Sequence, residues 1–395
     1  MMHLTPEAEL ERRTAGLQAL LQRENLDGAL VIQNTDLFYF AGTMQQSHLY
    51  VPSGGAPLLM ARKSYERARR ESALESVVPL DRLKDLPGLL AEHGHAPPKR
   101  LGLEMDVLPA NLYFAYEQLF QAEMLDVSPL VRQVRMVKSL YEVEIMRRAA
   151  RLMDQVFGSV GEHLREGMTE VELAGRLEAV ARRLGHQGIV RMRTWNQEMF
   201  YGHLMAGASA GVPSYLASPT GGAGLTPAIA QGPGFKRIAR HEPILLDYVG
   251  AVDGYLADQT RIFALGALPD WLVAAHQAML AVQQTVVEAA HPGVTCADLY
   301  RLAVRTAADL GYGEHFMGRP PERIPFVGHG VGLELDEWPI LAEQSPHHLQ
   351  PGMVFALEPK LIYPGEGVVG IENMFLVGAD GLERLTLTSE ELAVL

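Results

Sequence analysis

The chain has 395 residues, of which 48% are hydrophobic and 21% charged, and its formal net charge is −13. That length exceeds what one hydrophobic core usually holds, so we expect two domains, and the acidic balance disfavours binding to nucleic acid, which is itself a polyanion. The single cysteine excludes an intrachain disulfide, and neither a signal peptide nor an apolar run long enough to cross a membrane is recognisable, so we expect a soluble, cytoplasmic protein.

The first part of the chain alternates between strand-like and helix-like segments. DGALVIQ at 27–33, PLLMA at 57–61 and LGLEMD at 101–106 are apolar runs of strand length. The strongly charged stretch 63–74 is typical of a helix. This alternation favours an α/β domain, which we place at residues 1–130.

A helix start marks the beginning of the second part. SLYE at 139–142 has the form of a capping box, in which the serine and glutamate side chains bond to each other's backbone N–H groups. Apolar residues follow at helical spacing. We therefore predict a linker at 131–139 and a second domain at 140–395.

The second part contains an internal repeat. GMTEVEL at 167–173 and GVTCADL at 293–299 share a glycine, a threonine suited to cap a helix, and an acid three residues later. Each helix is followed by a Leu-Gly pair, which ends at Gly185 in one copy and Gly311 in the other. Two helices followed by strands, twice, predict a duplicated α+β domain with approximate two-fold symmetry and a site between its halves.

Two aspartates lie in an otherwise apolar hairpin. Residues 245–249 and 255–263 are predicted to be strands that flank a DG turn. Because side chains alternate along a strand, this turn places Asp247 and Asp258 on the same face.

Three further polar residues lie in apolar surroundings nearer the C-terminus. His329 is flanked by glycines that permit close approach of the backbone. Glu358 ends the strand-like run 353–359, and Glu372 lies inside the run 368–377. Each residue alone has an ordinary explanation, such as an exposed acid or a local hydrogen bond. Four buried negative charges together are costly, so they favour one cation or two, with manganese, iron, cobalt or zinc suited to such ligands.

Taken in this order, D-x10-D, G-H-G-x-G, E-P and the later glutamate resemble the motifs of the creatinase/aminopeptidase P/methionine aminopeptidase superfamily, the M24 "pita-bread" metallopeptidases. The phrase GHGVGLELDEWP at 328–339 and the N-terminal domain resemble the prolidase and aminopeptidase P branch. The resemblance covers essentially the whole chain. It implies a creatinase-like N-terminal α/β domain at 1–130 and a duplicated pita-bread catalytic domain at 140–395.

The resemblance also implies what the polar residues do. Two divalent ions are expected, manganese in the first place and cobalt or zinc as alternatives, with Asp258 and Glu372 shared between them. Glu358 is expected to be the general base as well as a ligand. The implied activity is hydrolysis of Xaa-Pro bonds in small peptides, by a dipeptidase or aminopeptidase that forms a homodimer. The family's five metal ligands match Asp247, Asp258, His329, Glu358 and Glu372.

Around these ligands the chain departs from the family pattern. Asp336 stands where prolidase-like members usually carry a histidine, residues 226–231 contain no histidine, and Gly370 replaces an arginine. Asp336, His203 and Tyr201 are therefore predicted to bind substrate. Four further residues are candidates for the same role: Trp195, Tyr255, Arg261 and Trp338.

The altered auxiliary residues leave two alternatives open. One is a metal-dependent hydrolase or lyase that acts on a different small substrate, and the other is a non-catalytic relative. The glycine-rich stretch 218–234 is expected to be a loop near the active site, because a long segment without regular structure is usually functional or mobile. It lacks the lysine and serine or threonine of a phosphate-binding loop.

Overall fold

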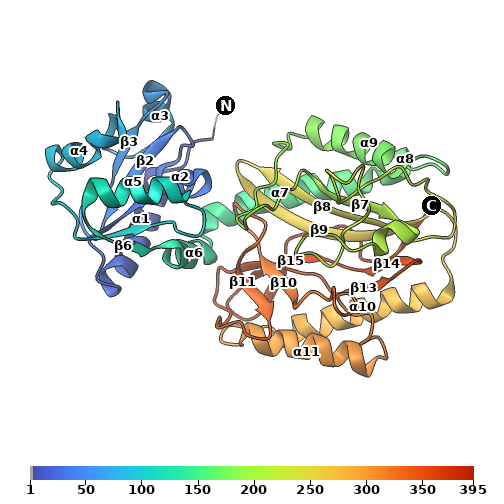
Figure 1. The fold of residues 1–395 in the computed structure, drawn as a ribbon. Helices are drawn as coiled ribbons and strands as arrows, with labels where there is room; N and C mark the ends of the chain where they lie inside the picture. The colour runs from blue at the N-terminus through green and yellow to red at the C-terminus, as the bar shows by residue number, and fades with distance from the viewer. Residues whose placement is uncertain (1–2) are drawn as a thin grey trace. The chain divides into compact units, whose positions relative to one another are not determined.

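The computed structural model describes residues 3–395, which form two compact units, one reaching to Arg135 and the other at Met136–Leu395 (Figure 1). Within the described part of the chain, no helix has the length and apolar character needed to cross a bilayer. The N-terminal unit contains the helices α1 (Glu7–Arg23), α2 (Asn34–Ala41), α3 (Tyr65–Glu71), α4 (Leu86–Glu92), α5 (Ala110–Phe120) and α6 (Ser128–Met136), a 3₁₀ turn at Leu83–Asp85, and the strands β1 (Gly28–Val31), β2 (Ser47–Pro52), β3 (Leu58–Ala61), β4 (Val77–Pro79), β5 (Arg100–Leu103) and β6 (Glu123–Asp126).

A mixed six-stranded sheet of order β4-β3-β2-β1-β5-β6 organises the N-terminal unit. β1 pairs antiparallel with β2 and parallel with β5. The strands predicted at 27–33, 57–61 and 101–106 correspond to β1, β3 and β5, and the predicted helix is α3. β2 has the sequence SHLYVP and was not predicted as a strand, because its serine and histidine interrupt the apolar pattern. All of its residues are nevertheless buried.

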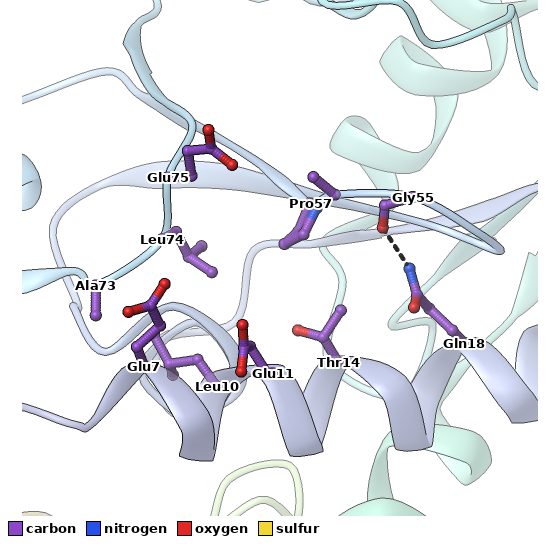
Figure 2. A pocket seen from close by; sticks show the side chains of 11 residues that line it. Glu7, Leu10, Glu11, Thr14, Gln18, Gly55, Pro57, Ala73, Leu74 and Glu75 are labelled. Atoms are coloured by element: carbon purple, nitrogen blue, oxygen red, sulfur yellow. Dashed lines mark hydrogen bonds between the residues drawn. The ribbon is translucent and has the colours of Figure 1, made fainter.

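The N-terminal unit also holds a pocket of about 340 Å³ between α1 and the segments at 55–57 and 73–75 (Figure 2). Gln18 donates a hydrogen bond to the carbonyl of Gly55 at 2.8 Å. Three glutamates, Glu7, Glu11 and Glu75, belong to its wall, and none of the wall residues is a histidine. The pocket therefore does not contain the mixed set of ligands that the sequence predicts for a metal.

The C-terminal unit carries the remaining elements. These are the helices α7 (Leu140–Gly158), α8 (Val160–His163), α9 (Glu170–Arg183), α10 (Asp270–Ala289) and α11 (Cys296–Asp309), a 3₁₀ turn η2 (Gly207–Gly211), and the strands β7 (Gly202–Ala206), β8 (Ile244–Val252), β9 (Tyr255–Ala264), β10 (Phe326–Gly330), β11 (Glu337–Ala342), β12 (Val354–Leu357), β13 (Lys360–Tyr363), β14 (Gly367–Gly370), β15 (Asn373–Val377), β16 (Leu382–Arg384) and β17 (Ala393–Val394).

The duplication predicted from the sequence is visible in this unit. Helices α7 and α9 precede the antiparallel strands β7, β8 and β9, whereas α10 and α11 precede the sheet of order β11-β10-β12-β15-β16. The two helix pairs lie on opposite sides of the strands (Figure 1). Thr169 and Thr295 cap α9 and α11 through their hydroxyl groups, and Gly185 and Gly311 follow the helix ends with φ of +100° and +87°.

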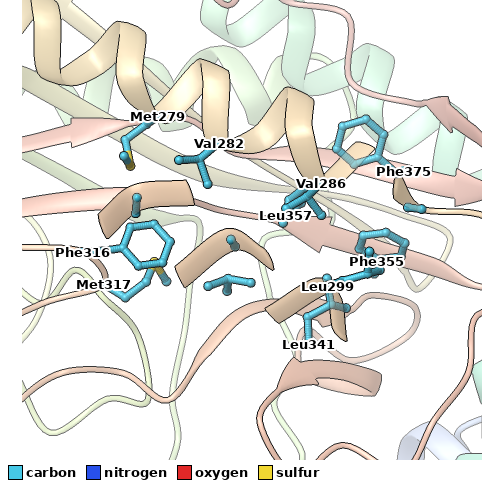
Figure 3. Close-up of a cluster of buried hydrophobic side chains, with 14 of the residues drawn as sticks. Met279, Val282, Val286, Leu299, Phe316, Met317, Leu341, Phe355, Leu357 and Phe375 are labelled. Atoms are coloured by element: carbon cyan, nitrogen blue, oxygen red, sulfur yellow. The ribbon is translucent and has the colours of Figure 1, made fainter. Parts of the chain in front are cut away.

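Two apolar cores fix the strands that carry the polar residues. In the first, Val282 and Val286 of α10 pack with Phe355 and Leu357 of β12 (Figure 3). In the second, side chains of α7 and α9 pack against β7, β8 and β9, with Leu246 among them. Each fully buried large apolar side chain contributes about 1.5–3 kcal/mol, so the strands have little freedom to move.

The predicted hairpin is confirmed as β8 and β9. The turn residue Asp253 has φ of +47° and is followed by Gly254 at +90°, as a two-residue turn of the primed type requires. Asp258 of β9 lies opposite Val249 of β8. Val249 follows Asp247 by two residues on β8, so its side chain points to the same face as that of Asp247. Both aspartates therefore lie on one face of the hairpin, as predicted.

The prediction of a single strand at 368–377 is wrong. β14 ends at Gly370 and β15 begins at Asn373, so Glu372 lies in a break between two strands. Its backbone forms an isolated bridge with Thr260 of β9. The break is stabilised by Arg261, which donates a hydrogen bond to the carbonyl of Glu372 at 2.7 Å.

Candidate metal centre

The five predicted ligands come together within the C-terminal unit. They lie on strands or directly at strand ends, where the surrounding backbone is fixed by sheet hydrogen bonds. Asp258, Glu358 and Glu372 are 4%, 4% and 1% exposed. The residues are Asp247 on β8, Asp258 on β9, His329 on β10, Glu358 directly after β12, and Glu372 between β14 and β15.

One side of this cluster fits a divalent ion. Nε2 of His329 lies 3.8 Å from Oδ2 of Asp258, 3.7 Å from Oε1 of Glu358 and 3.7 Å from Oε1 of Glu372. These separations are too long for hydrogen bonds, but two ligands that each lie about 2.1 Å from one ion are about 3–4 Å apart. Oδ1 of Asp258 and Oε1 of Glu372 are buried without a hydrogen-bond partner. Buried oxygens without a partner beside a histidine are groups that a cation would satisfy.

Hydrogen bonds hold the imidazole of His329 in the orientation of a ligand. Its Nδ1 bonds to the carbonyl oxygen of Leu335 at 2.8 Å, which leaves Nε2 directed at the carboxylates. The loop that supplies this carbonyl is held by Glu337, which accepts a hydrogen bond from the backbone N–H of Leu333 at 2.8 Å. Glu337 is itself paired with buried Lys138 at 2.9 Å. The orientation of His329 therefore depends on a chain of buried contacts.

The other side of the cluster is occupied by Lys360. Its Nζ lies 3.0 Å from Oδ2 of Asp247, 2.8 Å from Oε2 of Glu358 and 2.9 Å from Oε2 of Glu372, and its side chain is 1% exposed. Glu358 and Glu372 therefore each direct one oxygen towards Lys360 and the other towards His329. The sequence predicted two ions, and the cluster oxygens without a hydrogen-bond partner belong to Asp258 and Glu372, which both face His329.

The crowded charges shift the proton affinities of the cluster. Burial raises the pKa of Asp258 well above its usual range, and the carboxylate of Glu372 adds to this. Burial also raises the pKa of Glu358 to about 7, although Lys360 opposes the shift. Burial would raise the pKa of Glu372 too, but Lys360 and His329 lower it to about 2. For His329, burial is outweighed by the carboxylates, Glu372 first, which raise its pKa to about 10. A metal ion needs the neutral imidazole, so its binding would release a proton.

For Lys360 the same balance favours the charged form. Burial alone would lower its pKa, but the carboxylates of Asp247, Glu358 and Glu372 outweigh burial and hold the pKa well above the usual range. Lys360 was not predicted from the sequence, although a signal existed. Lys360 follows Glu358 by two positions, a spacing that places two side chains on the same side of an extended chain.

The three predicted substrate residues lie in different settings. His203 on β7 is opposite Asp247, and its Nδ1 is 3.2 Å from Oγ1 of Thr220, which lies 3.4 Å from Oδ2 of Asp247. His203 is 2% exposed, and burial lowers its pKa. It therefore borders the carboxylates. Tyr201 instead belongs to the apolar core, where its ring centroid is 4.6 Å from that of His186.

Asp336 serves a local structural purpose. Its Oδ1 accepts a hydrogen bond from the backbone N–H of Arg193 at 3.2 Å, and its Oδ2 accepts one from the hydroxyl of Thr194 at 2.5 Å. Both carboxylate oxygens are thus engaged in holding the segment at 193–194. A histidine at this position would offer a proton to a neighbour, whereas this carboxylate accepts two.

The other candidates for substrate binding are mostly structural. Tyr255 donates a hydrogen bond to buried Glu142 at 3.0 Å, and the ring of Trp338 packs on His347. Trp195 is 80% exposed. Arg261 is buried and donates at 2.7–2.8 Å to the carbonyls of Thr260, Glu372, Thr388 and Ser389 and to the side chain of Asn373.

The stretch at 218–234 is a loop, as predicted, and it reaches the carboxylates through Thr220. Gln231, from the region where the resemblance implies a histidine, lies with its Oε1 3.2 Å from Nε2 of His203. A pocket of about 310 Å³ begins at this loop, and its wall includes Ser218 and, from β13, Ile362. Neither Lys360 nor any of the five predicted ligands belongs to the wall of this pocket.

The chain is similar to known protein families and structures along nearly its whole length. The family described as Metallopeptidase family M24 matches residues 144–379, and the Creatinase/Prolidase N-terminal domain matches residues 13–137. An Xaa-Pro dipeptidase of Pyrococcus furiosus is 26% identical over 97% of this chain and 100% of its own length. One from Lactobacillus delbrueckii subsp. lactis is 28% identical over 96% of this chain and 98% of its own. The structure of an Xaa-Pro dipeptidase from Bacillus anthracis matches with a TM-score of 0.83 at 25% identity, covering 98% of this chain and all of the other. The predicted fold, a creatinase-like domain followed by a pita-bread domain, is confirmed.

Proposed function

Because the chain belongs to metallopeptidase family M24, we propose that it hydrolyses Xaa-Pro bonds of small peptides with a divalent ion held among Asp258, His329, Glu358 and Glu372. The observation that carries the proposal is that Asp258 and Glu372 each have a buried oxygen without a hydrogen-bond partner and each place an oxygen within 3.8 Å of Nε2 of His329. The choice of Xaa-Pro bonds is supported by relatives of that name that align along nearly the whole chain.

Glu358 is the group that moves the proton in this proposal. A bound divalent ion supplies polarisation of the scissile carbonyl and a lowered pKa for water. Oε1 of Glu358 lies on the His329 side of the cluster, while Oε2 is held by Lys360. Glu358 then accepts the proton of the attacking water and delivers it to the leaving amine. In the site without an ion, burial raises the pKa of this carboxyl group to about 7, and a group that takes up and releases a proton near neutral pH is suited to both steps.

Other residues of the chain hold this machinery in place. Thr260 donates a hydrogen bond to Oε2 of Glu372 at 2.8 Å and so fixes the carboxylate plane. His203 and Thr220 line the edge next to Asp247, and in this proposal they face the substrate where the family's auxiliary histidines are absent.

Manganese as the ion, a homodimer as the assembly and a cytoplasmic location remain predictions of the sequence.

A second candidate keeps the metal but changes the substrate. It is a hydrolase or lyase that acts on another small molecule, and the observation in its favour is Asp336. Where the resemblance implies a histidine, this carboxylate is used to hold Arg193 and Thr194. A site without that proton donor is less suited to stabilise a tetrahedral intermediate of peptide cleavage.

A substrate panel separates the two candidates. The purified chain is stripped with a chelator, reloaded with manganese, cobalt or zinc, and assayed on Xaa-Pro dipeptides, on matched Xaa-Ala dipeptides and on longer Xaa-Pro peptides. We expect cleavage of Xaa-Pro dipeptides that chelation abolishes and an added ion restores. Cleavage of other amides but of no Xaa-Pro peptide, with any of the ions, would favour the second candidate.

Replacing Glu358 with glutamine tests the proposed base. The amide keeps the size of the side chain but cannot accept the proton, so kcat is expected to fall by about 10²-fold or more. Glu383→Gln is the control, because Glu383 pairs with Arg147 at the surface. Turnover of the Glu358→Gln variant at the rate of the unmodified chain would show that another group is the base.

A further inference from the structure

We propose that the ammonium group of Lys360 takes the place of one of the two metal ions of this fold, so that the centre binds a single divalent ion. The inference rests on the proposed function only in that the carboxylates hold an ion at all. It concerns the composition of the centre and not the identity of the substrate.

The contacts of Lys360 are those of a cation at the centre of a ligand set. Its three carboxylate partners come from three separate places in the chain, and all three lie within 3.0 Å of Nζ. A second ion beside Asp247 would need oxygens that Lys360 already occupies, because the other oxygens of Glu358 and Glu372 face His329. Lys360 and a second ion therefore compete for one set of lone pairs.

An ion cannot easily displace the ammonium group of Lys360 from the cluster. Its side chain is fully buried, and its backbone is held at the start of β13 by pairing with Gly370 and by the N–H of Met317, which bonds to its carbonyl at 2.9 Å. Moving the ammonium out of the cluster would leave a buried charge without partners, which costs several kcal/mol. The lysine is thus a permanent part of the centre.

The charge balance also favours one ion. In the ion-bound form His329 is neutral and the carboxylates of Asp247, Asp258, Glu358 and Glu372 are ionised, so beside the one ammonium they leave three negative charges uncompensated. One divalent ion reduces the excess to a single negative charge. Two divalent ions beside Lys360 would instead give a buried net positive charge.

The number of metal ions bound per chain tests this proposal directly. Chelated protein is reloaded with excess manganese, desalted, and analysed for metal by mass spectrometry. We expect about one ion per chain for the unmodified protein and about two for Lys360→Ala, because alanine exposes the oxygens of Asp247, Glu358 and Glu372 to a second ion. Lys236→Ala is the matched control, since it removes an ammonium paired with Glu242 in the same unit but outside the cluster, and it is expected to keep the ratio unchanged.

A second measurement covers the case in which Lys360→Ala does not fold. Electron paramagnetic resonance of the unmodified, manganese-loaded protein is expected to show the spectrum of an isolated ion, whereas a pair of ions that share carboxylates gives an exchange-coupled spectrum. Two ions per chain, or a coupled spectrum, in the unmodified protein would overturn the proposal. So would a folded Lys360→Ala variant that still binds one ion.

The two proposals fail in different ways. If the unmodified chain binds one ion but cleaves no Xaa-Pro peptide, the proposed function is wrong and the role of Lys360 stands. If it cleaves Xaa-Pro dipeptides with two ions bound, the role of Lys360 is wrong and the proposed function stands.

Discussion

Replacing His329 with alanine is expected to remove the bound ion and to lower kcat/KM for Xaa-Pro dipeptides by at least about 10³-fold, because polarisation of the carbonyl by a metal is worth several kcal/mol. His329 supplies the one nitrogen ligand, and its Nε2 lies within 3.8 Å of oxygens of Asp258, Glu358 and Glu372. Alanine would also remove the bond from Nδ1 to Leu335. Activity with a saturating ion and metal content after desalting are the two measurements.

His186→Ala is the matched control for this experiment. His186 is also a buried imidazole of the C-terminal unit, but it bonds to the carbonyl of Val249 at 2.8 Å and packs against Tyr201, away from the carboxylates. We expect some loss of stability but no loss of metal. Retention of the ion by His329→Ala, or its loss from both variants alike, would contradict the assignment of His329 as a ligand.

Replacing Arg261 with leucine is expected to destabilise the C-terminal unit by at least about 3 kcal/mol, because several buried carbonyls lose their hydrogen-bond donor at once. The guanidinium links β9 to the break that contains Glu372 and to the segment at 388–389. Loss of this link also frees Glu372, so metal affinity should fall together with stability. Burial lowers the pKa of Arg261 to about 10, which still leaves it charged near neutral pH.

Urea denaturation followed by tryptophan fluorescence measures this effect. The three tryptophans, Trp195, Trp271 and Trp338, all lie in the C-terminal unit, so the signal reports that unit alone. Arg147→Leu is the control, because Arg147 pairs with Glu383 at the surface, where such a pair contributes about 0–1 kcal/mol. An Arg261→Leu variant as stable as this control would show that the buried bonds do not hold the break together.

The sequence predicted the fold well where local patterns and the final structure agree. The two glycine and threonine repeats became capped helices of matching length, and the DG turn set the register of the hairpin. The resemblance supplied the larger architecture. β2 was missed because its buried face includes a serine and a histidine, which the pattern of apolar residues alone does not reveal.

For the site, the sequence identified which carboxylates meet but not how their charges are balanced. Glu372 was predicted to lie inside one strand, and the break around it depends on Arg261, more than a hundred positions earlier. Lys360 was missed for a similar reason. Its spacing from Glu358 is local, but its contact with Asp247 exists only after the two halves of the unit have packed together. Tyr201 was predicted from its chemical type, and the structure places it in an apolar core.

The position of Lys360 bears on the order in which the protein folds and acquires its metal. In a centre made of carboxylates alone, mutual repulsion would oppose closure until cations arrived, and folding would depend on the supply of metal. Here Asp247, Glu358 and Glu372 already share a cation that is encoded in the chain and present from synthesis. We therefore expect the polypeptide to reach its compact form without metal, so that the proposed ion binds to a fold that is already complete.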